Sequence, residues 1–297
     1  IKHSLEMRHG KFTFRARDKS LRINKPIICG IINVTSDSFS GDGILKGVRA
    51  SADIKKRVLI KVEAMVRDGA KMIDIGAEST RPYAVAVSER EEIKRLMPVL
   101  RAVRRKFPKL IISVDTYKYE VAKEALNRGV DVINDITAMR HSPKIASLVS
   151  KYNLGCILMH MKGSPRTMQI NPYYKKGAIN EVFDFLKARV EYCLDSGIAE
   201  KQLMIDPGIG FGKTVDDNYR IIKNLYVFKS IGLPIFLGVS RKSFIGKALN
   251  VSVDERLYGT ISALVASYIN GASALRVHDV KEARQALKIA HLITNAN

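Results

Sequence analysis

The stretch IICGIINVTSDSF (27–39) begins as an unbroken apolar run and ends in amide, hydroxyl and carboxyl side chains. Such a run is typical of a parallel strand that is buried on both faces. Seven further runs follow the same plan: MIDIGAESTRP (72–82), LIISVDT (110–116), VINDI (132–136), CILMHMKG (156–163), LMIDPGIGFGKT (203–214), IFLGVSRKS (235–243) and ALRVHD (274–279). Eight such units predict an α/β fold, a (β/α)8 TIM barrel with its active site at the carboxyl ends of the strands.

The segments between these runs predict the helices of the barrel, at 53–69, 89–106, 118–128, 143–151, 178–196, 216–229, 254–270 and 280–292. Ahead of the first strand, the alternating segment KFTFRARDKSLRI (11–23) predicts a hairpin with its turn at Asp18 and Lys19. We expect this hairpin to close the bottom of the barrel. The domain organisation is therefore an N-terminal hairpin extension, 1–26, and one barrel domain, 27–297, because α/β barrels commonly reach this length as single domains.

Composition excludes several classes of protein. With 46% hydrophobic residues among 297, the chain can bury a sizeable core, yet it has neither a long apolar stretch typical of a membrane span nor an apolar signal segment at its start. The three cysteines have no paired spacing, which favours a reducing, cytoplasmic location without disulfides. The net charge of +21 is spread over helical segments without a nucleic-acid-binding motif, so nucleic acid is not an expected partner.

The strand ends carry a set of polar residues suited to a flat heterocycle. Asp115 and Asp206 end two different strands, Asn134 ends a third, and Lys242 follows a fourth. Buried carboxylates need donors, and an amide both donates and accepts, so the group would suit a ring with an amidine-like donor edge. The alternative is a network of purely structural carboxylates around Lys242. Several such residues at one rim favour a binding site.

A second set of residues is suited to an anion. Arg276 and His278 alternate along RVHD and therefore point to the same face, while Asn33 ends the first strand and Arg81 lies in the second loop. Together they could hold a diphosphate, with Asn33 supplying one oxygen to Mg²⁺. The spacing of the histidines does not fit a zinc site. The segment GIGFGKT (208–214) lacks the spacing of a dinucleotide-binding fingerprint or a P-loop. Its Phe211 could form an aromatic wall beside a ligand.

Eight motifs in order resemble those of the dihydropteroate synthase family of pterin-binding (β/α)8 barrels. They are NVTSDSFS (33–40), ESTRP (78–82), SVDTYK (113–118), IND (133–135), LMHMKGSPRTMQ (158–169), DPGIGFGKT (206–214), GVSRKSFIG (238–246) and RVHDV (276–280). The resemblance implies a transferase of folate biosynthesis that condenses (7,8-dihydropterin-6-yl)methyl diphosphate with 4-aminobenzoate. The products would be 7,8-dihydropteroate and diphosphate. It further implies a Mg²⁺ cofactor, a homodimer and sensitivity to sulfonamides that mimic aminobenzoate.

The resemblance also assigns roles to residues, taken over motif by motif. The pterin would be bound by Asp115, Asn134, Met159, Asp206 and Lys242. The 4-aminobenzoate pocket would be formed by Ser38, Thr80, Arg81, Pro82, Phe211 and Ser240. The diphosphate would be held by Asn33, Arg81, Arg276 and His278, with Asn33 as the metal ligand. Catalysis itself would depend on Asp37, Phe39, Lys242 and Arg276. Ser36, Ala77 and Tyr83 depart from the family pattern.

Two alternatives remain open at this point. A pterin-dependent methyltransferase of the same barrel family would use the pterin carboxylates but would have no need for an anion site. A non-catalytic barrel would be expected to have lost Asp115, Asp206, Lys242 or Arg276, and all four are present.

Overall fold

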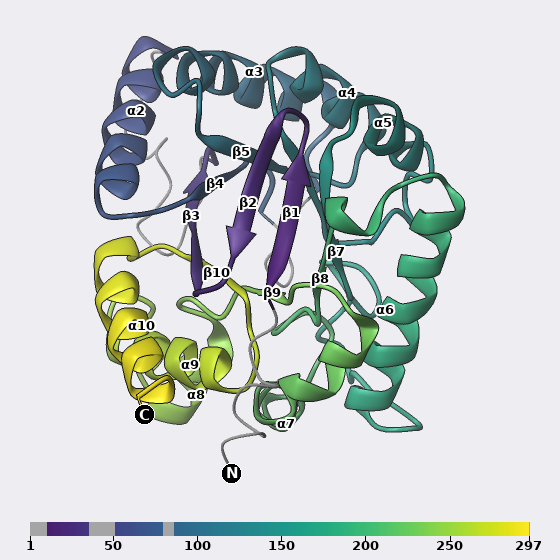
Figure 1. Cartoon of the computed structure of the whole chain (residues 1–297), viewed down its shortest axis with the longest axis vertical. Helices are drawn as coiled ribbons and strands as arrows, with labels where there is room; N and C mark the ends of the chain where they lie inside the picture. The colour runs from purple at the N-terminus through teal and green to yellow at the C-terminus, as the bar shows by residue number, and fades with distance from the viewer. Residues whose placement is uncertain (1–10, 36–50, 80–85, 297) are drawn as a thin grey trace.

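The computed structural model describes residues 11–35, 51–79 and 86–296 and shows a barrel of parallel strands surrounded by helices (Figure 1). The strands are β3 (Ile27–Asn33), β4 (Met72–Gly76), β5 (Ile111–Asp115), β6 (Val132–Asp135), β7 (Gly155–Met159), β8 (Leu203–Asp206), β9 (Phe236–Leu237) and β10 (Ala274–Val277). Their order is β8-β7-β6-β5-β4-β3-β10-β9. A parallel bridge between Ile205 and Ile235 joins the two end strands, so the predicted TIM barrel is confirmed.

The outer helices follow the predicted pattern closely. They are α2 (Ser51–Arg67), α3 (Glu89–Lys106), α4 (Tyr119–Asn127), α5 (Ile145–Tyr152), α6 (Ala178–Asp195), α7 (Val215–Lys223), α9 (Leu257–Ile269) and α10 (Val280–Thr294), and Figure 1 shows them around the strands. Two short helices were not predicted, η1 (Glu200–Gln202) and α8 (Ser243–Leu249), and a third, η2 (Leu225–Ile231), begins inside a segment predicted as one longer helix. Each is too short to give a readable apolar period.

The predicted helix 216–229 was wrong in one respect, because it divides at Asn224 into α7 and η2. The side-chain amide of Asn224 donates to the carbonyl oxygen of Arg220 at 2.8 Å. An asparagine that bonds to nearby backbone in this way competes with continuation of the helix.

Alternate side chains of each strand belong to two different hydrophobic cores, one between the strands and the helices and one inside the barrel. In β4, Ile73 and Ile75 belong to the core between strands and helices, whereas Met72 belongs to the core inside the bottom of the barrel. Alternate residues of a strand face opposite sides, so Asp74 lies on the same inner side as Met72. In the pairing of β4 with β5, Asp74 lies opposite Ser113. An acid is thereby placed inside the barrel, below the rim.

An antiparallel hairpin of β1 (Phe12–Ala16) and β2 (Lys19–Ile23) covers the bottom of the barrel, and it lies in front of the strands in Figure 1. The hairpin is confirmed, but the turn lies one residue earlier than predicted, because Ala16 pairs with Lys19. Phe14 enters the inner core, where a Cβ added to Gly155 would lie 2.5 Å from its ring. The absence of a side chain at Gly155 thus makes room for the hairpin.

All three cysteines, Cys29, Cys156 and Cys193, are free and buried. Burial raises the pKa of the Cys29 and Cys156 thiols well above the usual value, which makes them poor nucleophiles. Within the described residues, none of the helices combines the length and apolar character that crossing a membrane requires.

Candidate active site

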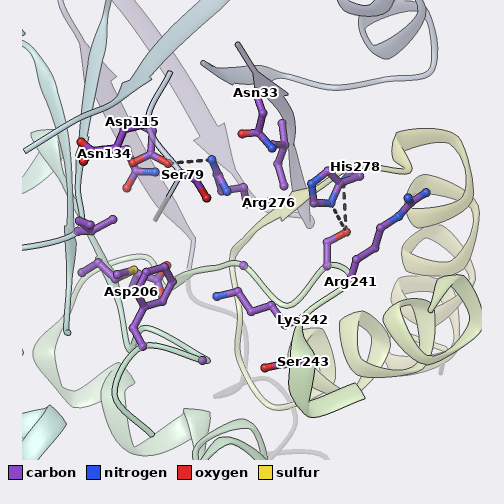
Figure 2. Close-up of a pocket in the computed structure, with 18 of the residues that line it drawn as sticks. Asn33, Ser79, Asp115, Asn134, Asp206, Arg241, Lys242, Ser243, Arg276 and His278 are labelled. Atoms are coloured by element: carbon purple, nitrogen blue, oxygen red, sulfur yellow. Dashed lines mark hydrogen bonds and ion pairs between the residues drawn. The ribbon is translucent and has the colours of Figure 1, made fainter. Parts of the chain in front are cut away.

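A cavity of about 270 Å³ opens at the carboxyl ends of the barrel strands. Every predicted site residue that the structure describes lines this one cavity: Asn33, Asp115, Asn134, Met159, Asp206, Phe211, Ser240, Lys242, Arg276 and His278. Figure 2 shows many of them converging from different strands. The remaining predicted site residues, Asp37, Ser38, Phe39, Thr80, Arg81 and Pro82, lie outside the described residues, as do Ser36 and Tyr83.

Arg276 of β10 stands at the centre of an ionic network beneath the rim. Its Nε donates to Asp74 Oδ2 at 2.6 Å and its Nη2 donates to Asp115 Oδ2 at 3.0 Å. The side-chain amide of Asn134 donates to the same Asp74 oxygen at 3.0 Å. Asp74 is fully buried and had no predicted role. The signal was available, since an acid in the middle of the apolar run MIDIG must find donors.

The network shifts the pKa values of its members in opposite directions. Burial raises the pKa of Asp115 to about 7, since it outweighs the attraction of Arg276 and is reinforced by the negative charge of Asp74. Burial alone would lower the pKa of Arg276, but Asp74 and Asp115 outweigh it and raise that pKa. Arg276 is thus a permanent cation, and Asp115 is a carboxyl group that titrates near neutral pH.

Asp206 and Lys242 occupy another part of the cavity (Figure 2). Asp206 Oδ1 accepts the backbone N–H of Gly208 at 2.7 Å. Lys242 Nζ donates to the carbonyl oxygen of Ile209 and lies 4.6 Å from the centre of the Phe211 ring. Burial raises the pKa of Asp206, against the attraction of Lys242, and burial lowers the pKa of Lys242 to about 8. The two groups present one acceptor and one donor to a ligand.

His278 and Asn33 form the remaining polar side of the cavity (Figure 2). The Oγ of Ser240 lies 2.9 Å from His278 Nδ1 and also accepts the backbone N–H of His278 at 3.3 Å. Arg241, which precedes Lys242, makes a bidentate pair with Asp279 at 2.7 and 3.1 Å. This pair ties the segment after β9 to the end of β10. The predicted common orientation of Arg276 and His278 is borne out, as both line the cavity.

The arrangement divides the cavity into two chemical zones. Asp115, Asn134 and Asp206 offer acceptors to a donor-rich ring, and Met159 offers an apolar surface. Arg276, His278 and Asn33 suit a multiply charged oxyanion. Within the described residues there is no cluster of three or more histidine, cysteine or acidic side chains that would cage a metal. A single amide oxygen from Asn33 fits Mg²⁺, which is commonly held by few protein ligands and by substrate phosphates.

A lysine-centred network that had no predicted role lies beside the cavity. Lys118 Nζ is 2.6 Å from Glu78 Oε2 and 2.7 Å from Glu92 Oε2, and all three side chains are almost completely buried. Glu78 Oε1 accepts the backbone N–H of Val87 at 3.1 Å. The network joins the end of β4 to the start of α3, and so holds the two ends of the second strand-to-helix connection together.

Comparison with known proteins agrees with this site. Residues 29–278 match the family model described as pterin binding enzyme. A dihydropteroate synthase of Haemophilus influenzae is 43% identical over 95% of this chain and 98% of its own, and one from Escherichia coli is 39% identical over 95% and 96%. The chain belongs to the dihydropteroate synthase family. These relatives favour the synthase over the methyltransferase alternative.

Solved structures of the family share the whole fold. A Yersinia pestis dihydropteroate synthase with a sulfonamide drug complex superposes with a TM-score of 0.89 and 38% identity, covering 96% of this chain and 100% of that one. A Xanthomonas albilineans dihydropteroate synthase with 4-aminobenzoic acid superposes with a TM-score of 0.87 and 32% identity, covering 97% and 100%. The family resemblance expected from the eight motifs is therefore confirmed.

Proposed function

We propose that this chain joins (7,8-dihydropterin-6-yl)methyl diphosphate to 4-aminobenzoate, releasing diphosphate and forming 7,8-dihydropteroate. The observation that carries the proposal is the meeting of an acceptor-rich zone and an oxyanion zone in one cavity. The first suits the pterin ring and the second suits the leaving group. A methyltransferase would use only the first.

The pterin is bound through its donor edge in this proposal. Asp206 and Asp115 accept N–H groups of the ring, and Asn134 and Lys242 complete the polar contacts. Met159 supplies apolar surface beside the ring plane. Binding the rigid ring in this way fixes its exocyclic methylene in one place, which is the main entropic requirement of a reaction between two small molecules.

The leaving diphosphate is stabilised by Arg276, His278 and Asn33. Arg276 uses two of its five N–H donors on Asp74 and Asp115, so three remain for phosphate oxygens as far as the described residues show. Asn33 would hold Mg²⁺ together with the diphosphate, and the ion would neutralise part of the charge that develops on the leaving group. Arg276 is held in place by its carboxylates before substrate arrives, which is what preorganised stabilisation requires.

The aniline nitrogen of 4-aminobenzoate then attacks the methylene carbon. The new C–N bond forms as the C–O bond to diphosphate breaks, and the nitrogen loses a proton to solvent. Phe211 and Ser240 line the part of the cavity proposed for 4-aminobenzoate. The pocket is proposed to be completed by Ser38, Thr80, Arg81 and Pro82. Asp37 and Phe39 are proposed to lie near the developing positive charge. Sulfonamides are proposed to bind in the 4-aminobenzoate pocket. The reaction needs no covalent nucleophile from the protein.

A turnover assay separates the two chemistries. We expect diphosphate release to require both 4-aminobenzoate and Mg²⁺, and to match the dihydropteroate formed one for one. Release that proceeds without 4-aminobenzoate would be simple hydrolysis and would contradict the proposal. Transfer of a methyl group from a methylated folate, without diphosphate release, would support the methyltransferase instead.

The dependence of kcat/KM on pH should be bell-shaped, with limbs near pH 7 and pH 8. Because the pKa of Asp115 is raised to about 7, its acceptor charge is present above that pH and lost as pH falls through it. Because the pKa of Lys242 is lowered to about 8, its charge is present below that pH and lost as pH rises through it. In Asp115→Asn the acid limb should disappear. An acid limb that survives in this variant would assign it to another group.

The assembly and location of the chain are also part of the proposal. We expect a homodimer, and the support is a set of exposed apolar side chains on the last two helices, namely Tyr258 on α9 and Ile289, Leu292 and Ile293 on α10. Sedimentation of a 33.1 kDa species at micromolar concentration would contradict it. The buried free cysteines are compatible with the expected cytoplasmic location.

A further inference from the structure

Lys213, which follows the glycine-rich segment 207–212, is buried with only 2% of its surface exposed. Its Nζ donates to the carbonyl oxygens of Gly208 and Phe211 at 2.9 and 3.1 Å, and it lies 2.9 Å from His160 Nδ1. The carboxylate that attracts this nitrogen most strongly is that of Asp206 in the cavity. Burial lowers the pKa of Lys213 to about 7 against this attraction, and the direct partners of its nitrogen are the three contacts named above.

The segment that Lys213 holds has an unusual backbone. Gly208, Gly210 and Gly212 have positive φ angles of 72°, 82° and 67°. A Cβ at Gly208 would lie 1.9 Å from the carbonyl oxygen of His160, so the segment packs directly against the end of β7. Such a glycine-rich backbone has little conformational preference of its own. Its shape therefore depends on external hydrogen bonds.

Other side chains bond to the segment at single points. Gln169 donates to Gly210 O at 2.7 Å, and Tyr174 donates to Gly212 O at 2.7 Å. Asn218 Oδ1 accepts the Gly210 N–H at 2.6 Å. Lys213 differs because it bonds to two carbonyl oxygens three residues apart, and so sets the curvature between them.

The other side of the same segment forms part of the cavity. Gly210 and Phe211 line it, and Ile209 O accepts a hydrogen bond from Lys242 Nζ. The Phe211 ring lies 4.6 Å from Lys242 Nζ. A shift of the segment would therefore move both an aromatic wall and the partner of the cavity lysine.

We propose that Lys213, together with His160, is a positioning residue that holds segment 208–211 in the shape needed to bind the pterin. It acts through Phe211 and Lys242 and does not contact the substrate itself. The inference depends on the proposed pterin site.

The charge state of His160 agrees with this arrangement. Burial, and then the positive charge of Lys213, lower the pKa of His160 to about 2, so the ring is neutral. In its ammonium form Lys213 can only donate, so Nδ1 then accepts and the ring proton is on Nε2. The ring is held edge-on to Phe185, with 4.9 Å between centroids. His160 thus offers a fixed acceptor to Lys213.

The test is the affinity for 6-(hydroxymethyl)pterin, an unreactive probe, measured by calorimetry on Lys213→Met, which keeps an unbranched apolar chain one atom shorter and removes the donors. We expect affinity to fall on the order of tenfold, the effect of one or two lost hydrogen bonds. In turnover, the KM for the pterin substrate should rise more than kcat falls. Lys223→Met, which removes an exposed lysine from α7, is the matched control and should bind like the wild type.

His160→Phe keeps an aromatic ring and removes both ring nitrogens, including the acceptor for Lys213, so it tests the inference even where Lys213→Met is too unstable to assay. It should weaken pterin binding severalfold, and His160→Gln, which retains an acceptor, should recover part of the loss. The double variant should bind no worse than Lys213→Met, because the two residues share one interaction. Folded variants of both residues with wild-type pterin affinity would overturn the inference. A wild-type protein that fails to bind the probe would overturn the proposed function itself.

Discussion

Arg276→Met is expected to abolish measurable condensation and to lower the free energy of unfolding by about 3 to 5 kcal/mol. The loss of stability follows from Asp74, which is fully buried and, of its donors among the described residues, would keep only the amide of Asn134. The loss of activity follows from the proposed contact between Arg276 and the departing diphosphate. Denaturant unfolding and the diphosphate-release assay measure the two effects separately.

A second variant separates structure from chemistry. Combining Arg276→Met with Asp74→Asn removes both members of the ion pair, so part of the stability should return while activity should not. Recovery of turnover in the double variant would show that Arg276 serves only to neutralise Asp74. Wild-type turnover in Arg276→Met alone would remove the diphosphate assignment.

Asp206→Asn is expected to weaken pterin binding roughly 100-fold, which corresponds to about 2 to 3 kcal/mol, while leaving the fold intact. The fold should survive because asparagine keeps an oxygen that can accept the Gly208 N–H, now 2.7 Å from Asp206 Oδ1. Binding should suffer because the charged acceptor for the pterin donor edge is gone. Calorimetry with 6-(hydroxymethyl)pterin and thermal unfolding together measure this.

Asp216→Asn provides the control for this substitution. Asp216 lies exposed on α7 and forms an ion pair with the equally exposed Arg220, at 2.7 Å, so its replacement should change neither pterin affinity nor stability appreciably. Unchanged pterin affinity in Asp206→Asn would remove Asp206 from the pterin site. A large loss of stability in that variant would instead give the carboxylate a structural role.

Much of the site could be predicted because barrel topology converts sequence position into spatial position. Residues such as Asp115, Asp206 and Arg276 end strands that are far apart in the chain, yet parallel strands bring their carboxyl ends to one rim. What could not be predicted is which of these groups contact each other. Asp115 and Arg276 were assigned to different parts of one substrate, the pterin ring and the diphosphate, and in the structure they form an ion pair at 3.0 Å. Ion pairing depends on side-chain geometry across the barrel, which strand order alone does not specify.

By itself, the sequence determined the alternation of strands and helices, the hairpin under the barrel and the residues gathered at its open end. These features follow from local apolar patterning and from the fixed handedness of strand-helix-strand connections. Only the tertiary structure decided that Asp74 supports Arg276 from inside the barrel, that Lys118 joins Glu78 to Glu92, and that Lys213 bonds both to the glycine-rich segment and to His160. The physical reason is burial. A charged side chain far from water must find partners wherever the packed interior provides them, and those partners come from distant parts of the chain.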